Sequence, residues 1–326
     1  MPNRISLQEA AELLLQQNDI LILTHAYPDG DTLGSGFALC GALHNAGKRA
    51  RVACPDVIPA RFDYMTKPVR RNQFDEQFIV AVDIADPKLM GRFEAQYGGK
   101  VDLSIDHHPS NLLFAARNYV QGEAAATCEI IYELIGYMNL PLDNNIVSAL
   151  YTGISTDTGC FRYANVTADT HRIVAELMAF EVDFAEINRV MFETKSRARV
   201  EIERAAMTDM EFFNKDLCAM ITVSKALCDR SGASDDELEG ITSLPRKIEG
   251  VLLGITLRER GENFYKVSMR SYDPVNAAAL CAIFGGGGHA RAAGCQIQGT
   301  LDEVKAKIRQ TATEQVNCAL AAAARE

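Results

Sequence analysis

The stretch DILILTHAYPDGD (19–31) decides the fold, because a continuous apolar run passes directly into a group of polar side chains. Such a run is expected of a central strand in a parallel sheet that helices cover on both faces. Ligands of α/β folds bind at the carboxyl ends of these strands. His25, Asp29 and Asp31 follow at that end, so we expect them to form part of a site. A plain Asx turn is the structural alternative for this segment.

The segments around this stretch alternate between strand and helix patterns, which indicates an α/β domain with a mainly parallel sheet flanked by helices. Further strand patterns occupy residues 49–53, 77–84 and 101–106. Helical periodicity covers residues 32–47, 123–139, 143–158, 167–180 and 183–195. We therefore expect a sheet of four strands followed by a block of helices.

The second half of the chain has a different pattern. The charged helical stretch TKSRARVEIERAAMTDMEFF (194–213) offers few core positions and is typical of a connector. Beyond it, strand patterns occupy residues 216–224, 249–260 and 264–271, and an Ala-rich helix occupies residues 301–324. The sequence thus predicts a domain over residues 1–195, a helical linker over 196–213 and a smaller α+β domain over 214–326.

Composition narrows the class of protein. A chain of 326 residues with 48% apolar content can bury a substantial core. The net charge of −10 disfavours binding to long duplex DNA but not to short phosphates, since bound cations would neutralise part of the charge. No apolar run reaches the roughly 18 to 20 residues that cross a bilayer. Nine cysteines without a C-x-x-C pair favour reduced thiols, so we expect a cytoplasmic protein with no membrane partner.

Acidic and histidine side chains recur at the ends of other apolar segments. Asp83 closes IVAVD, His107 and His108 follow VDLSID, and Asp157 lies in YTGISTDTG. An unpaired buried carboxylate is costly, and metal coordination would remove that cost. One His with two Asp can hold one cation, and one His with three Asp a second, if Asp83 bridges them. This oxygen-rich set favours Mn²⁺ or Mg²⁺ over zinc, and such a pair of cations would polarise a phosphoryl group.

These motifs resemble those of a known family. The pattern H-x-x-x-D-x-D at 25–31, Asp83, the triplet 106–108 and Asp157 are similar to the four motifs of the DHH phosphoesterases. GGGGHARAAG (285–294) resembles the glycine-rich motif of their C-terminal substrate domain, DHHA1. The resemblance covers nearly the whole chain. It implies two metal sites that share Asp83, one on His25, Asp29 and Asp83 and the other on Asp31, Asp83, His107 and Asp157.

The resemblance also implies roles beyond metal binding. His108 would contact phosphate or act as general acid, and Asp106 would fix its neighbours, so the catalytic group is His108, Asp83 and Asp106. Adjacent side chains at a strand end diverge, so that one imidazole can bind metal while the other faces the substrate. The implied substrate-binding residues lie in the second domain: Arg270, Gly286, Gly287, Gly288, His289 and Arg291. The glycine run would be an anion cradle, with a flexible loop as the alternative.

The compact two-domain form resembles the oligoribonucleases, or nano-RNases, that also dephosphorylate 3′-phosphoadenosine 5′-phosphate (pAp). This implies a Mn²⁺-dependent hydrolase, with Mg²⁺ as the second candidate, acting on RNA of about 2 to 5 nucleotides and converting pAp to AMP. One alternative is a phosphodiesterase acting mainly on products of cyclic dinucleotides, such as pApA and pGpG. Another is a nucleotide-binding regulator without catalysis, which the intact ligand set disfavours. Both a monomer and a homodimer are compatible with the sequence.

Overall fold

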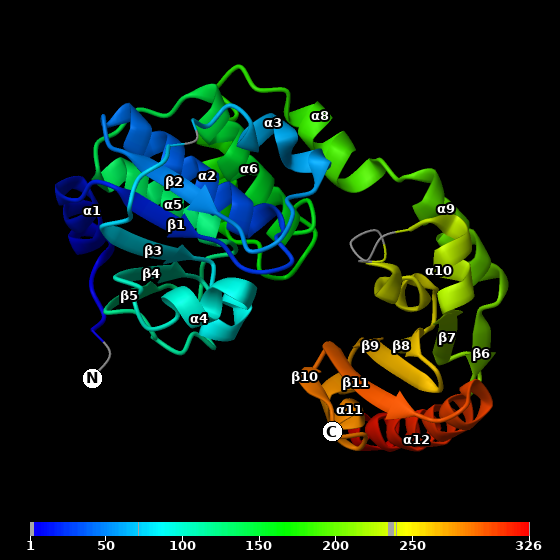
Figure 1. The fold of residues 1–326 in the computed structure, drawn as a ribbon. Helices are drawn as coiled ribbons and strands as arrows, with labels where there is room; N and C mark the ends of the chain where they lie inside the picture. The colour runs from blue at the N-terminus through cyan, green and yellow to red at the C-terminus, as the bar shows by residue number, and fades with distance from the viewer. Residues whose placement is uncertain (1–2, 71, 234–237, 239, 326) are drawn as a thin grey trace. The chain divides into compact units, whose positions relative to one another are not determined.

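The computed structural model describes residues 3–70, 72–233, 238 and 240–325 and divides into two compact units, Met1–Thr194 and Lys195–Glu326 (Figure 1). Each unit has its own sheet and its own apolar core. None of the helices in the described ranges is long and apolar enough to cross a membrane. All nine cysteines carry free thiols.

The first unit is built on a parallel sheet of five strands in the order β2-β1-β3-β4-β5. The strands are β1 (Ile20–Leu23), β2 (Ala50–Ala53), β3 (Phe78–Val82), β4 (Leu103–Asp106) and β5 (Arg117–Val120). The four predicted strands are present. The fifth, β5, was not predicted, because its short sequence RNYV has too few apolar residues to stand out; it pairs in parallel with β4 at the sheet edge.

The strand order creates a switch point between β1 and β3. The chain leaves β1 toward β2 on one side and then returns to form β3 on the other side. In open α/β sheets, ligands bind at such a point, outside the carboxyl ends of the strands. His25 and Asp83 follow β1 and β3 closely, so the topology places both at the switch point.

Helices cover both faces of this sheet (Figure 1). Ile20 and Ile22 point into a core shared with α1 (Leu7–Gln16), α2 (Gly30–Asn45), α5 (Thr127–Tyr137), α6 (Asn144–Asp157) and α7 (Ala168–Leu177). Leu21 and Leu23 point to the opposite face, which η2 (Pro87–Phe93) and α4 (Glu94–Tyr97) cover. The remaining short helices of the unit are η1 (Ala60–Phe62), α3 (Asp63–Thr66), α8 (Phe184–Asn188) and η3 (Arg189–Glu193). Because successive side chains of each strand are buried on opposite faces of the sheet, the strands appear in the sequence as continuous apolar runs.

The second unit contains a mixed sheet of six strands in the order β10-β11-β9-β8-β7-β6. They are β6 (Glu211–Phe213), β7 (Cys218–Val223), β8 (Leu253–Gly261), β9 (Phe264–Ser271), β10 (Gly287–His289) and β11 (Ala292–Gln298). Only β7 and β8 run parallel. The strands predicted at 249–260 and 264–271 are β8 and β9, which pair antiparallel as a hairpin.

Helices also cover both faces of the second sheet. Helices α11 (Ala277–Ala282) and α12 (Leu301–Ala323) enclose one core with Ile255 and Val267. Helices α9 (Arg197–Thr208) and α10 (Lys225–Ser231), with the short helix η4 (Ile241–Ser243), enclose another with Ile221 and Val223. A further short helix, η5 (Pro245–Lys247), precedes β8.

The segment predicted as a helical linker, residues 196–213, takes a different form. It contains helix α9 and strand β6, and β6 pairs antiparallel with β7. Ile202 and Ala206 of α9 are buried in the second unit. A helix can dock through a single apolar stripe. The remaining faces of α9 carry charged residues, and these give the segment the composition of an exposed connector.

Candidate active site

Besides Asp106, which contacts His108, the structure brings together the seven other side chains that the metal and catalytic motifs singled out. They form three overlapping groups of potential metal ligands: His25, Asp29 and Asp83; Asp31, His107 and Asp157; and Asp83, His107 and His108. The ends of β1, β3 and β4, the start of α2 and the end of α6 supply them. Helix α2 can approach α6 closely because residue 34 is glycine; a Cβ there would lie 2.4 Å from the carbonyl oxygen of Ala149.

His25 lies between two carboxylates. Its Nε2 is 3.6 Å from Asp29 Oδ1 and 3.6 Å from Asp83 Oδ2. Its Nδ1 donates to the carbonyl of Ala26 at 2.8 Å, which directs Nε2 toward the carboxylates. These separations exceed a normal hydrogen bond. They are closer to the roughly 3.0 to 3.4 Å that separates two ligands bound about 2.1 Å from a shared ion.

His107 faces the second group of carboxylates. Its Nε2 lies 3.4 Å from Asp157 Oδ2, 3.8 Å from Asp83 Oδ1 and 3.9 Å from Asp31 Oδ2. Its Nδ1 donates to the carbonyl of Ala124 at 3.1 Å. Asp83 therefore presents Oδ2 to the His25 group and Oδ1 to the His107 group, which is the arrangement of a bridging carboxylate.

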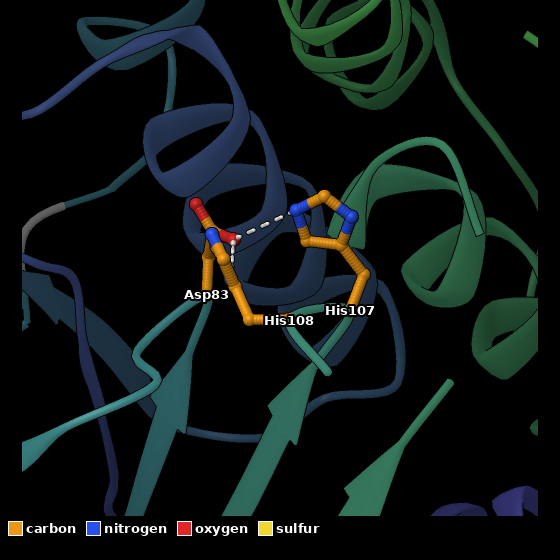
Figure 2. A group of neighbouring side chains, drawn as sticks. All are labelled: Asp83, His107 and His108. Carbon is orange, nitrogen blue, oxygen red and sulfur yellow. Dashed lines mark ion pairs between the residues drawn. The ribbon is translucent and has the colours of Figure 1, made fainter. Parts of the chain in front are cut away.

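The adjacent imidazoles of His107 and His108 both approach Asp83 (Figure 2). His108 Nδ1 lies 3.6 Å from Asp83 Oδ1, and the two rings meet edge to face with centroids 4.5 Å apart. The two side chains diverge less than we expect for adjacent residues at a strand end. They differ in exposure, because the side chain of His107 is 14% exposed and that of His108 is 43% exposed. Of the two imidazoles, only that of His108 therefore has a substantial solvent-facing surface.

Asp106 orients His108 from behind. Its Oδ1 accepts hydrogen bonds from His108 Nδ1 at 2.8 Å and from the His107 amide at 2.9 Å, and its Oδ2 accepts one from Asn111 Nδ2 at 2.6 Å. Burial raises the pKa of Asp106, but the hydrogen bonds from His108 and Asn111 lower it more. The hydrogen bond to ionised Asp106 raises the pKa of His108 to about 9, against the effect of burial, so its imidazole is protonated at neutral pH without a cation.

Asp31 is held by the start of α5. Its Oδ2 accepts from the Thr127 amide at 2.7 Å and its Oδ1 from the Cys128 amide at 2.9 Å. The Thr127 hydroxyl donates to Asp83 Oδ1 at 2.9 Å. Thr127 thus fixes two of the carboxylates. The sequence offered no signal for this residue or for Asn111, because neither lies in a motif or at a strand end.

The Asx turn considered for residues 29–31 is also present. Asp29 Oδ1 accepts from the amides of Asp31 and Thr32, each at 3.1 Å, and so caps helix α2. Asp29 Oδ1 therefore caps the first turn of α2 and also faces His25 Nε2.

The carboxylates make the cluster a strong proton acceptor when no cation is present. Burial and the charges of Asp83, Asp157 and Asp29 raise the pKa of Asp31 well above its usual range. Burial, together with the charges of Asp83 and Asp29, raises the pKa of Asp157 to about 7. Burial lowers the pKa of His25, yet the nearby carboxylates of Asp29 and Asp83 raise it to about 11 overall. Protons thus offset negative charge that a divalent cation would also offset.

The turn behind Asp157 has an unusual backbone. Gly159, Cys160 and Phe161 all have left-handed φ values, between 56° and 62°. Each of the two non-glycine residues costs roughly 1 to 2 kcal/mol in this conformation. The Cys160 amide donates to the carbonyl of Ser155 at 2.6 Å and helps to hold the turn. Helix α6 thus ends at Asp157, and the left-handed turn begins two residues later.

The predicted substrate-binding residues lie in the second unit, on β9, β10 and the turn before β11. Arg270 and His289 are both aligned with Ala292, so their side chains share one face of the sheet. Arg291 forms an ion pair with Asp273, and its Nη1 donates to the carbonyl of Val275 at 2.9 Å.

Part of the glycine run belongs to a strand, and the anion cradle expected there stays a prediction. Gly287 and Gly288 belong to β10, which pairs with β11. The Gly286 amide donates to the carbonyl of Cys281 at 2.9 Å. A Cβ at Gly286 would lie 2.3 Å from the carbonyl oxygen of Gly294, so packing alone requires glycine there.

Comparisons with known proteins agree with this architecture. Residues 19–154 match the DHH family, N-terminal domain, and residues 218–317 match the DHHA1 domain. The chain is 32% identical over 307 residues to the bifunctional oligoribonuclease and PAP phosphatase NrnA of Thermus thermophilus, covering 92% of this chain and 91% of that protein.

Solved structures share the fold. An exopolyphosphatase-related protein from Bacteroides fragilis matches with a TM-score of 0.85 and 24% identity, over 94% of this chain and 95% of that one. The exonuclease RecJ bound to manganese matches with a TM-score of 0.55 and 14% identity, over 94% of each chain. Two domain matches in the expected order and a relative above 30% identity along nearly the whole length lead to one conclusion: the chain belongs to the DHH family of phosphoesterases and carries the DHHA1 domain.

Proposed function

We propose that this chain hydrolyses short oligoribonucleotides to mononucleotides and pAp to AMP, using two divalent cations. The observation that carries the proposal is the position of Asp83, whose two carboxylate oxygens face two separate groups of ligands. The name of the Thermus thermophilus relative supports the substrate class.

The donor set fits a pair of divalent cations. His25 and His107 each use Nδ1 to bind a backbone carbonyl and direct Nε2 toward carboxylates, as metal-bound histidines do. We assign one cation to His25, Asp29 and Asp83, and the other to Asp31, Asp83, His107 and Asp157. With more oxygen than nitrogen ligands, Mn²⁺ is the first candidate and Mg²⁺ the second. Manganese is present in the RecJ structure of the same fold.

The chain's own groups position the reaction. When bound, such cations polarise a phosphoryl group and lower the pKa of a water between them. The amides of Thr127 and Cys128 hold Asp31 in one orientation, and the Thr127 hydroxyl does the same for Asp83. Both carboxylates are thus arranged before substrate arrives, which avoids reorganisation during the reaction.

His108 supplies the proton. Asp106 holds its Nδ1 and stabilises the imidazolium, and the exposed part of the ring is free to meet substrate. In this position His108 donates a hydrogen bond to the phosphoryl oxygen or a proton to the leaving ester oxygen. Asp106 itself acts as a positioning residue.

Turnover of labelled RNA of 2, 5 and 24 nucleotides, measured beside pAp and pApA with Mn²⁺ and with chelator, tests the proposal. The 2-mer, the 5-mer and pAp should be hydrolysed faster than the 24-mer, and the chelator should abolish all turnover. A strong preference for pApA over RNA 2-mers of other sequences would instead favour the cyclic-dinucleotide branch. Binding of these nucleotides without any hydrolysis in saturating Mn²⁺ would identify a regulator.

A further inference from the structure

One face of the second sheet gathers basic side chains above small neighbours. Arg270 on β9 is aligned with Gly254 on β8 and with Ala292 on β11. Directly opposed residues point to the same face, so neither neighbour fills the space beside the Arg270 side chain. His289 shares this face, whereas Met269 points into the core on the other side.

Arg246, which lies outside every motif, joins this face. The backbone of η5 runs directly over Gly254, where a Cβ would lie 2.6 Å from the Arg246 amide nitrogen. The Arg246 guanidinium carbon lies 4.9 Å from the ring centroid of Tyr272, two residues beyond Arg270. Tyr272 is still 48% exposed, although its amide is fixed by a 2.9 Å bond to the carbonyl of Leu252. Two arginines and an aromatic ring therefore meet at the end of β9.

The charges of this group lack a counter-ion among the residues that the structure describes. The buried Nε of Arg246 has no hydrogen-bond partner there. Within the described ranges, Arg270 Nη1 donates only to the carbonyl of its neighbour Met269, at 3.0 Å. Burial, together with the charge of Arg246, lowers the pKa of Arg270. Two like charges, a buried donor without an acceptor and an exposed aromatic ring favour a ligand that is both anionic and aromatic.

We propose that Arg246, Arg270 and Tyr272 form a nucleotide-binding face that takes a phosphate on the two guanidinium groups and a nucleobase on the tyrosine ring. The inference rests on the proposed function for the identity of the nucleotide as part of a short RNA or pAp. Arginine forks suit phosphate, and stacking on an aromatic ring accepts any base. Arg246 and Tyr272 are thus binding residues for substrate.

Fluorescence tests the face independently of catalysis. The chain has no tryptophan, so Tyr272→Trp introduces a single probe, and Tyr137→Trp, at an exposed tyrosine of α5, is the matched control. In chelator, AMP should quench the emission of the first variant and not that of the control, and ribose 5-phosphate should quench neither. Adding Arg246→Gln to Tyr272→Trp should weaken the AMP response about 10- to 100-fold. Unchanged emission, or equal quenching of the two tryptophan variants, would overturn the proposal.

Kinetics supply the second test. Arg246→Gln should raise KM for an RNA 2-mer and pAp about 10- to 100-fold, more than it lowers kcat, and Arg246→Lys should raise KM less. Arg309→Gln is the control, because Arg309 also lies over an aromatic ring, that of Phe213 at 5.1 Å. An unchanged KM, or an equal rise in KM for the Arg309→Gln variant, contradicts the assignment. If the unsubstituted protein hydrolyses neither nucleotide, the proposed function fails, and the fluorescence result still decides the face.

Discussion

At the residue scale, Asp83 joins the two halves of the site. It follows β3 with a left-handed φ of 60°, a conformation that Asp and Asn tolerate better than most residues. That backbone turn lets one carboxylate reach both the His25 and the His107 groups. The geometry is therefore set by a backbone conformation as well as by the acidic side chain.

Asp83→Asn should retain the fold and lose activity. The amide keeps the shape, the left-handed backbone and an oxygen for the Thr127 hydroxyl, but it removes the charge proposed to bridge two cations. We expect turnover to fall more than about 100-fold and bound Mn²⁺ to fall below two per chain. Metal analysis and turnover of an RNA 2-mer measure both, with Asp169→Asn at an exposed position as control. More than a tenth of the original activity in saturating Mn²⁺ would rule out the bridging role.

Thr127 should matter although it is not a proposed ligand. Thr127→Val removes the hydrogen bond to Asp83 Oδ1 but leaves the amide that binds Asp31. Loss of such an outer hydrogen bond lowers metal affinity or activity about 10- to 100-fold. Thr127→Ser should restore most of the loss, because it retains the hydroxyl. Mn²⁺ titration followed by turnover measures the effect, and equal defects in the Val and Ser variants would assign Thr127 a packing role.

At the element scale, strand order and helix packing assemble residues that are far apart in the sequence. The switch between β1 and β3 brings His25 beside Asp83, and the close approach of α2 and α6 brings Asp31 toward Asp157. Helix α5 then points its first amides at Asp31. The site thus depends on three packing contacts at the carboxyl end of one sheet.

Helix α9 provides a test of the boundary between units. Ile202 is buried against the second sheet, so Ile202→Ala should lower the free energy of unfolding by about 2 to 4 kcal/mol. Val200 on the same helix is 51% exposed, and Val200→Ala should cost less than about 0.5 kcal/mol. Urea unfolding followed by circular dichroism compares them. Similar small effects would mean that α9 acts as the expected linker instead of as part of the second unit.

At the scale of the whole molecule, we propose that chemistry belongs to the first unit and substrate positioning to the second. Among the residues that the structure describes, the potential metal ligands lie within residues 25–157, whereas Arg270 and His289 share a face of the second sheet. The net charge of −10 is compatible with substrates that offer few phosphates.

Arg270→Ala and His289→Ala should therefore separate two kinds of substrate. Turnover of RNA 2-mers and pAp should fall at least about tenfold, because binding energy from groups remote from the scissile bond is lost. Turnover of bis-p-nitrophenyl phosphate and bound Mn²⁺ should change little. Lys307→Ala on the exposed side of α12 serves as control. Proportional losses on both substrates, with metal content unchanged, would place these residues at the chemical step.

Local patterns in the sequence predict the class of fold and the proposed ligand set. Continuous apolar runs identify strands that are buried on both faces, and polar groups at their carboxyl ends identify the site, because both signals are local. The local patterns did not predict three features: strand β5, the docking of α9, and strand β10 within the glycine run. Each depends on a partner distant in sequence: β4, the second sheet and β11.

Which carboxylate oxygen faces which histidine, and which groups support the proposed ligands, depends on contacts between elements that no local pattern reveals. Asp83 divides its two oxygens between His25 and His107 because of its backbone φ and the position of three strand ends. Thr127, Asn111 and Arg246 act through contacts with residues on other elements. Their sequence neighbourhoods carry no motif, since a hydrogen bond across elements needs only one suitable side chain in the right place.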